Sequence, residues 1–470
     1  MSARPFTPHE YQSFATQFLL ATPKAALYAD MGMGKTGAVL AVLDTLMHVG
    51  YDEPILVLAP KRVAQDVWPT EALKWEEFKK YYIMPIVGNE SVRNVAVTTR
   101  AHIHTCNYEN LEWLVQRVSP QKWPWKMIVA DESTKLKGFR TGKRGKGGTG
   151  SQEGVGGKRT KALSFVARLA ERWINLSGTP APNGLKDLWG QYWFLDQGER
   201  LGYTYTAFMQ RWFRQKYDGH GVEPMPHSER EIHERIGDIT MALRARDWFD
   251  LEQPKVNEIR VRLPDTLRTR YKQLERDLFT KLQCGTEVEV FNAAALTTKC
   301  LQFANGACYT KAPAWVPVHD LKLQALESIV NESGGKQLLV AYEFQSDRER
   351  ILKAFKGSVD ISTAKGLAAF KGGQAQIGVA HPASMGHGID GLQHGCWTLV
   401  YFGHGWAMDL RDQILERIGP MRQKQGGYDR VVEVYNIICD GTLDDDVIDR
   451  HESKRTVQEA LTAAMSRRAS

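Results

Sequence analysis

The chain has 470 residues, of which 43% are hydrophobic and 24% are charged, values that exclude a wholly disordered or fibrous protein. The net charge of +7 is concentrated in one segment, because residues 135–161 hold nine Lys/Arg and one acidic residue, a local charge of +8. No apolar run approaches the roughly 18–20 residues that span a bilayer, and the first ten residues lack an apolar signal core, so we expect an unsecreted protein without membrane spans.

Short apolar runs recur along the chain and are followed by stretches of helical character. They form two groups, before about residue 180 and after about residue 335, with a helix-rich stretch between them. Strands that are apolar on both faces and alternate with helices indicate an α/β fold with parallel sheets, so we predict two such lobes. The runs are Ile55–Ala59, Met127–Ala130, Trp173–Leu176, Gln337–Ala341, Gln376–Ala380, Thr398–Tyr401 and Val431–Ile437.

The N-terminal lobe contains a phosphate-binding loop. Ala29–Thr36 (ADMGMGKT) follows an apolar stretch and precedes a helical pattern, the context that this motif requires. Gly32 and Gly34 let backbone N–H groups turn toward phosphate oxygens, and the start of the helix adds the positive end of its dipole. Lys35 is placed to reach the β- and γ-phosphates of a nucleotide, and the Thr36 hydroxyl to bind Mg²⁺. The alternative is a glycine turn that happens to precede Lys-Thr.

An acidic pair directly follows the predicted strand Met127–Ala130. Because the carboxyl ends of parallel strands form the ligand-binding edge of a sheet, we predict that Asp131 holds Mg²⁺ and that Glu132 orients and deprotonates water. Adjacent carboxylates are common on protein surfaces, but a pair that ends a buried strand downstream of a phosphate loop is much rarer.

Further motifs recur in order from Tyr11 to about Asp446. They are Tyr11-Gln12, Leu58–Lys61, Cys106–Asn110, Asp131–Lys137, Leu176–Pro180, Gly386–Ile389, Gln413–Arg417 and Thr442–Asp444. With this set the sequence resembles a superfamily-two nucleic-acid motor, closest to the Swi/Snf-like branch of DNA translocases, and within it a stand-alone helicase of bacterial or phage type.

The resemblance implies an α/β fold of two RecA-like parallel-sheet lobes in tandem, with helical protrusions between them. Lobe 1 is expected over residues 1–245, with a basic glycine-rich insertion at 138–157 and a helical protrusion at about 190–240. A helical inter-lobe region at 246–325, lobe 2 at 326–455 and a C-terminal tail at 456–470 complete this division.

The resemblance also implies ATP and Mg²⁺ as cofactors. Arg417 is expected to be the arginine finger, a guanidinium from lobe 2 that stabilises the transition state, and Arg422 to replace the family's second arginine, whose usual position holds Pro420. The residues expected to contact the nucleotide are Gln12, Met31, Gly32, Met33, Gly34, Lys35, Thr36, Gly388 and Asp390.

Two further departures from the family pattern are present. Ser133 and Thr134 stand where the family has Ala-His, so the link between hydrolysis and DNA is expected to differ. Asp390 stands about where the family often has Asn.

DNA is the expected partner; double-stranded DNA is favoured, and single-stranded DNA is an open alternative. The residues expected to hold its backbone are Lys61, Arg62, Asn107 and Ser384. For Lys61 and Arg62, and for the insertion 138–157, a merely solvated surface is an open alternative. The aromatic residues between 189 and 213 are predicted to pack a helical core rather than to stack on bases.

The sequence therefore predicts an ATP-dependent DNA translocase or helicase that hydrolyses ATP to ADP and phosphate. Opening and closing of the two lobes on the DNA backbone would couple hydrolysis to movement, independently of base sequence. An RNA-stimulated helicase of the same superfamily and a nucleotide-gated DNA clamp with little turnover are open alternatives. We expect a cytoplasmic location in a bacterial or phage-infected cell.

Overall fold

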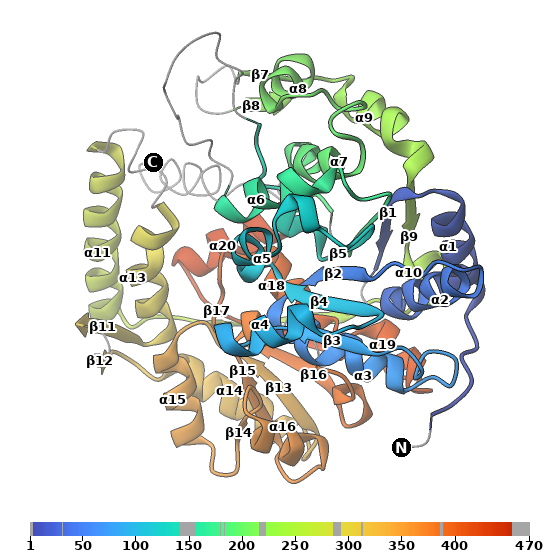
Figure 1. Cartoon of the computed structure of the whole chain (residues 1–470). Helices are drawn as coiled ribbons and strands as arrows, with labels where there is room; N and C mark the ends of the chain where they lie inside the picture. Colours follow the sequence, from blue (N-terminus) through green and yellow to red (C-terminus); the bar gives the residue numbers. More distant parts are fainter. Residues whose placement is uncertain are drawn as a thin grey trace. The chain divides into compact units, whose positions relative to one another are not determined.

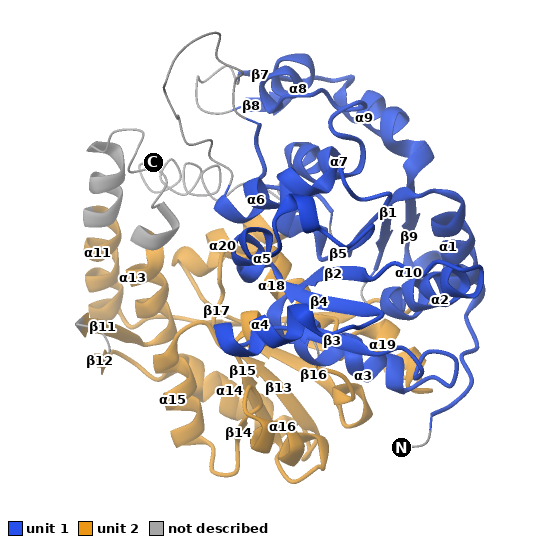
Figure 2. Cartoon of the chain, viewed as in Figure 1, with its two compact units in different colours: residues 1–250 blue, residues 251–470 orange. Residues whose placement is uncertain are grey.

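The computed structural model describes residues 3–30, 32–141, 157–178, 180–182, 184–215, 222–284, 293–311, 314–385 and 389–453. The chain divides into two compact units, residues 1–250 (unit 1) and 251–470 (unit 2) (Figure 2). The insertion predicted at 138–157 lies largely outside the described residues. No helix among the described residues is long and apolar enough to cross a membrane.

Unit 1 is built on a seven-stranded sheet in the order β3-β4-β2-β5-β6-β1-β9, in which all neighbours are parallel (Figure 1). Its central strands are buried along most of their length, in keeping with their mainly apolar sequences. The strands are β1 (Lys24–Ala29), β2 (Ile55–Ala59), β3 (Ile83–Ile86), β4 (Ile103–Asn107), β5 (Met127–Asp131), β6 (Arg172–Ser177) and β9 (Thr240–Leu243).

The helices of unit 1 follow the strands in the alternating pattern of an α/β fold. Helices α1 and α2 contact each other, as do α5 and α6, while α7 packs on β6 and β1. The helices are α1 (Glu10–Ala21), α2 (Lys35–His48), α3 (Trp68–Leu73), α4 (Glu90–Thr98), α5 (Leu111–Val118), α6 (Lys158–Ala167), α7 (Leu188–Asp196), α8 (Tyr205–Trp212), α9 (Ser228–Ile236) and α10 (Ala245–Trp248).

Helices α7 and α8 contribute aromatic side chains to the core of unit 1. Trp189, Phe194 and Phe208 are fully buried, and Trp212 is 1% exposed. A small hairpin of β7 (Phe213–Gln215) and β8 (Val222–Pro224) completes this region. These four side chains are therefore packed in the core, in agreement with the sequence prediction, and are not available for stacking on bases.

Unit 2 contains a six-stranded parallel sheet in the order β10-β17-β16-β13-β15-β14. Its strands are β10 (Lys255–Val261), β13 (Gln337–Ala341), β14 (Val359–Asp360), β15 (Ile377–Ala380), β16 (Cys396–Tyr401) and β17 (Glu433–Cys439). The predicted fold class, an α/β chain with two parallel-sheet lobes in tandem, is confirmed.

One strand of this sheet lies where the sequence predicted helical material. β10 is an edge strand whose residues alternate between exposed and half-buried positions, so it lacks the continuous apolar run that marks the buried strands. Its seven residues pair with β17 along their whole length. The second sheet therefore includes β10, which lies within residues 246–325, the segment predicted to be a helical inter-lobe region.

Helices and one antiparallel hairpin surround the second sheet. The hairpin of β11 (Ala307–Lys311) and β12 (Ala314–Pro317) follows α13 and lies beside it (Figure 1). The helices of unit 2 are α11 (Asp265–Cys284), α13 (Ala293–Asn305), α14 (Leu321–Glu332), α15 (Gln345–Ala354), α16 (Ala364–Lys371), α17 (Pro382–Met385), α18 (Met408–Leu415), α19 (Pro420–Gln425) and α20 (Leu443–Ser453).

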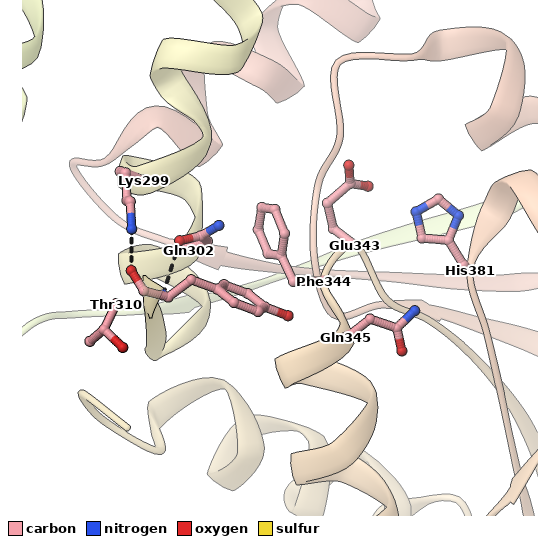
Figure 3. Close-up of a pocket in the computed structure, with 8 residues that line it drawn as sticks. Lys299, Gln302, Thr310, Glu343, Phe344, Gln345 and His381 are labelled. Atoms are coloured by element: carbon pink, nitrogen blue, oxygen red, sulfur yellow. Dashed lines mark hydrogen bonds between the residues drawn. The ribbon is translucent and has the colours of Figure 1, made fainter. Parts of the chain in front are cut away.

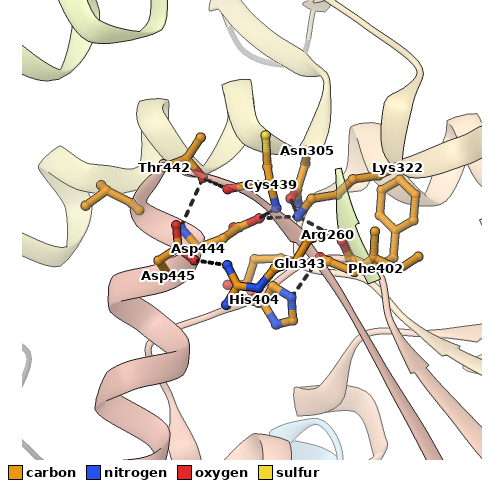
Figure 4. A network of polar contacts seen from close by, with 12 residues as sticks. Arg260, Asn305, Lys322, Glu343, Phe402, His404, Cys439, Thr442, Asp444 and Asp445 are labelled. Carbon is orange, nitrogen blue, oxygen red and sulfur yellow. Dashed lines mark hydrogen bonds and ion pairs between the residues drawn. The ribbon is translucent and has the colours of Figure 1, made fainter. Parts of the chain in front are cut away.

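A buried ion pair ties several of these elements together (Figure 4). Lys322 of α14 and Asp444 of α20 are both fully buried and lie 2.6 Å apart. The Lys322 ammonium also donates to Asn305 Oδ1 at 2.7 Å and to the Phe402 carbonyl at 3.2 Å. Because Asp444 in turn accepts from the Cys439 N–H, the pair links α13, α14 and α20 to the ends of β16 and β17.

The substitution Lys322→Met should destabilise unit 2 strongly. It keeps the side-chain volume but leaves the Asp444 carboxylate buried without its cation, so we expect a loss of about 3–5 kcal/mol in the free energy of unfolding. The control is Arg262→Ala, which removes an exposed ion pair and should change stability by less than about 0.5 kcal/mol. Denaturant titration followed by circular dichroism measures both, and equal midpoints would contradict the role given to Lys322.

Candidate functional site

The loop between β1 and α2 has the backbone geometry of a phosphate cradle. Gly32 and Gly34 have positive φ angles of 86° and 67°, which glycine adopts without strain. A Cβ atom at Gly34 would lie 2.3 Å from Nε2 at the end of the flexible Gln12 side chain, so a larger residue there would displace this amide. Lys35 folds back over the loop and donates to the Ala29 carbonyl at 2.6 Å and the Asp30 carbonyl at 3.2 Å. Met31 lies outside the described residues, and Met33 is buried.

Gln12 braces this loop from the N-terminal segment. Its Nε2 donates to the Gly34 carbonyl at 3.3 Å, and its Oε1 accepts from the His9 N–H at 2.9 Å. The rings of His9 and Tyr11 stack at 5.3 Å, and Phe249 lies edge-on to both. A cluster of three aromatic rings therefore lies beside Gln12, which was predicted to contact the nucleotide.

Asp131 ends β5 at the same carboxyl edge of the sheet. β6 alone separates β5 from β1, so Asp131 and the phosphate loop follow strands that are two positions apart. Burial and the neighbouring Glu132 charge raise the pKa of Asp131 to about 6, whereas a hydrogen bond from Trp68 Nε1 at 3.0 Å and the Lys35 ammonium oppose this rise. Lys35, which is anchored at the end of β1, and Asp131 at the end of β5 therefore lie at the same edge of the sheet.

Glu132 has a strained backbone and a restrained side chain. Its φ angle of 64° is in the left-handed region, which non-glycine residues rarely adopt. Its Oε1 accepts hydrogen bonds from Thr134 Oγ1 at 2.6 Å and from Ser177 Oγ, at the end of β6, at 3.5 Å. Strained residues of this kind cluster at functional sites.

These residues fit a nucleotide with Mg²⁺. The second residue of α2, Thr36, is partly exposed at the helix start, where backbone N–H groups bind anions. A hydroxyl, a carboxylate with a raised pKa and an ammonium at one sheet edge form the oxygen-rich, charged donor set that Mg²⁺ and phosphates prefer.

The predicted DNA-contacting residues have different surroundings. Lys61 is exposed and Arg62 partly exposed at the start of the helical segment after β2. Asn107 is buried. Its side-chain amide donates to the Glu109 carboxylate at 2.8 Å and accepts from Asn110 Nδ2 at 2.6 Å. In unit 2, Ser384 is partly exposed, and its hydroxyl donates to the carbonyl of His381.

The two predicted arginines of unit 2 also differ. Arg417 is 7% exposed and donates to the carbonyls of Met385 at 2.8 Å and Ile389 at 3.3 Å, on either side of Gly388, which lies outside the described residues. The Arg422 side chain is 21% exposed and forms an ion pair with Asp390 at 3.3 Å. Arg422 lies in α19, which begins at Pro420.

Unit 2 also contains a pocket that the sequence analysis missed (Figure 3). Its volume is about 680 Å³, and the side chains at the ends of β13 and β15 face those of α13 and β11 across it. Burial and the Asp347 charge raise the pKa of Glu343 to about 7, and burial lowers the pKa of His381. The rule that located Asp131, polar residues after a buried strand, would have located both. The lining residues are Lys299, Gln302, Tyr309, Thr310, Glu343, Phe344, Gln345 and His381.

Comparison with known proteins places these features in a family. Residues 11–145 match the model of the SNF2-related domain. Protein p41 of Acyrthosiphon pisum secondary endosymbiont phage 1 is 46% identical over 472 residues, which cover 98% of this chain and 99% of p41.

More distant relatives share part of the chain. The DNA excision repair protein ERCC-6-like of Bos taurus is 25% identical over 214 residues, 43% of this chain but 16% of the relative's length. A solved Sulfolobus solfataricus SWI2/SNF2 ATPase core in complex with dsDNA aligns over 97% of this chain and 93% of its own, at 19% identity and a TM-score of 0.45. The chain thus belongs to one family with phage protein p41, and its N-terminal part matches the SNF2-related domain.

Proposed function

We propose that the chain is a DNA-dependent ATPase that hydrolyses ATP to ADP and phosphate and uses this reaction to translocate along DNA or to unwind it. The observation that carries the proposal is the gathering of the phosphate loop, Asp131 and Glu132 at one edge of the first sheet. Relatives named as helicases and as a DNA excision repair protein support DNA as the partner. The phage relative supports an activity in the cytoplasm of a phage-infected cell.

The chemistry follows from the residues of unit 1. Backbone N–H groups at the start of α2 and the Lys35 ammonium would bind the phosphates. Thr36 and Asp131 would hold Mg²⁺, which when bound neutralises phosphate charge. Glu132 would orient a water molecule and accept its proton as the water oxygen bonds to the γ-phosphorus. Lys35 would have to exchange its contacts with Ala29 and Asp30 for phosphate oxygens.

The family resemblance further suggests that an arginine of unit 2 contributes to hydrolysis and that relative motion of the units moves DNA. Of the two candidates, Arg422 has the more accessible guanidinium, whereas the Nε and Nη1 of Arg417 donate to backbone carbonyls. We therefore favour Arg422 as the finger and Arg417 as a residue that holds the backbone at Met385 and Ile389.

Two alternatives are distinguished by the rate of ATP hydrolysis and by the nucleic acid that stimulates it. A clamp that binds DNA when nucleotide is bound would show little hydrolysis. An RNA-stimulated helicase would respond to RNA rather than to duplex DNA.

The first test compares ATP hydrolysis with no nucleic acid, single-stranded DNA, duplex DNA, forked DNA and RNA. We expect duplex DNA to stimulate phosphate release at least tenfold and independently of base sequence, because the expected contacts are to the backbone. Lys35→Ala should abolish turnover while the thermal midpoint stays within a few degrees. Wild-type turnover no faster than that of Glu132→Gln would favour the clamp, and stimulation by RNA alone would favour the RNA helicase.

A second prediction separates the arginines. Arg422→Ala should retain nucleotide binding and lose turnover by about a thousandfold, the lower range for an arginine finger. Arg417→Ala should lower the free energy of unfolding by about 1–3 kcal/mol, because carbonyls that it bonds in the interior lose their donor. ATPase kinetics and denaturant titration of both variants provide the measurement. Full turnover in Arg422→Ala would rule out this assignment.

A third prediction concerns pH. With a pKa of about 6, Asp131 is mostly ionised at pH 7.5 and about one-quarter ionised at pH 5.5, so Mg²⁺ affinity should fall about fourfold over this interval as the proton displaces the metal. Titrating Mg²⁺ at fixed ADP and following nucleotide binding by fluorescence gives the two affinities. Asp131→Asn serves as the control, because it removes the titrating carboxyl but leaves the titration of the nucleotide. Equal pH dependence in both proteins would show that Asp131 does not bind the metal.

A further inference from the structure

The side chain of Glu132 is held by hydroxyl groups of its own sheet edge. Thr134 Oγ1 donates to Glu132 Oε1 at 2.6 Å, and Ser177 Oγ reaches the same oxygen at 3.5 Å. Both hydrogen bonds that the described residues make to this carboxylate end on Oε1. Oε2 is therefore the oxygen left to accept a proton.

The residue that makes the shorter contact is itself fixed. Thr134 is 8% exposed and lies in the turn Ser133–Leu136, directly after β5. Its neighbour Ser133, fully buried, donates to Gln191 Oε1 of α7 at 2.7 Å. A Cβ atom at Gly190 would lie 2.6 Å from the Leu136 carbonyl, so glycine lets α7 pack directly against this turn.

Gln191 connects this turn to the chain that follows β6. Its side-chain Nε2 donates to the backbone carbonyls of Pro180 at 2.6 Å and Asp187 at 3.0 Å. Its backbone carbonyl accepts from Asn175 Nδ2 at 2.9 Å. The hydroxyl of Thr134 is thus presented from a turn that is hydrogen-bonded to buried neighbours, rather than from a mobile loop.

We propose that Thr134 is a positioning residue for Glu132: its hydroxyl holds Oε1 so that Oε2 faces the attacking water. This inference rests on the proposed ATP hydrolysis. In that step the water oxygen bonds to the γ-phosphorus, and the bond from phosphorus to the β–γ bridging oxygen breaks. Oε2 takes the water proton and later releases it to solvent, and ADP and phosphate leave.

Glu132 needs a positioning residue because a glutamate side chain is conformationally free. Fixing an unrestrained glutamate in one rotamer costs conformational entropy, because its side chain has several rotatable bonds. A short hydrogen bond from a hydroxyl to a carboxylate is among the stronger kinds, so it can offset this cost before the nucleotide arrives. Thr134 stands where the family has His, and this departure has a structural consequence, because the threonine hydroxyl donates a hydrogen bond to Glu132, two residues earlier in the chain.

The test is a pair of substitutions of similar shape. Thr134→Val keeps the branched side chain and removes the donor, and Thr134→Ser keeps the hydroxyl. We expect kcat for duplex-stimulated ATP hydrolysis to fall about 10- to 100-fold in Thr134→Val, because a misplaced base loses this much. KM for ATP and the equilibrium affinity for ADP should stay within about twofold, and Thr134→Ser should recover kcat to within about threefold.

A double substitution tests whether Thr134 acts through Glu132. Adding Thr134→Val to Glu132→Gln should cause no further loss, since the two residues act as one unit. Thermal unfolding of each variant reports folding, and Thr134→Ala replaces Thr134→Val if the latter fails to fold.

Three results would overturn the inference: unchanged kcat in the variant without the hydroxyl, loss that serine does not restore, or additive loss with Glu132→Gln. Normal turnover in Glu132→Gln alone would overturn the proposed base as well, so failure of the proposed function is distinguishable from failure of the role given to Thr134.

Discussion

The candidate site of unit 1 centres on a partly buried carboxylate at the end of β5. Asp131 lies beside a second acidic residue, Glu132, and burial and that neighbour raise its pKa to about 6. The Trp68 indole and the Lys35 ammonium favour the ionised form, which keeps the site charged near neutral pH. A divalent cation would compensate the two carboxylates further. The same residues that make this edge electrostatically unfavourable in isolation therefore make it a suitable site for a metal and a polyphosphate.

The position of most residues at this edge of the sheet could be predicted, because they belong to short motifs that directly follow a strand. The glycines, Lys35 and Thr36 follow one strand, and Asp131 and Glu132 follow another, so spacing and strand position sufficed. Trp68 could not be predicted, because it comes 63 residues before the carboxylate that it contacts. The contact from Ser133 to Gln191 spans 58 residues and likewise depends on how α7 packs.

The second unit shows the limits of the apolar pattern. Both sheets were expected from buried runs, but β10 was missed because an edge strand alternates between exposed and half-buried residues. The Lys322–Asp444 pair gave no signal, since a lysine in a helical pattern normally lies on the surface. The roles of Arg417 and Arg422 stay predictions, and their different surroundings, backbone carbonyls for one and Asp390 for the other, provide the basis for choosing between them.

Residues 32–36 and Asp131 are proposed to form one nucleotide and metal site. A crystal structure of the chain with Mg²⁺ and a non-hydrolysable ATP analogue is the decisive test. We expect phosphates against the N–H groups at the start of α2, with the metal bound to the Thr36 hydroxyl and to Asp131, directly or through one water. A nucleotide bound elsewhere, or a metal that contacts neither residue, would contradict it.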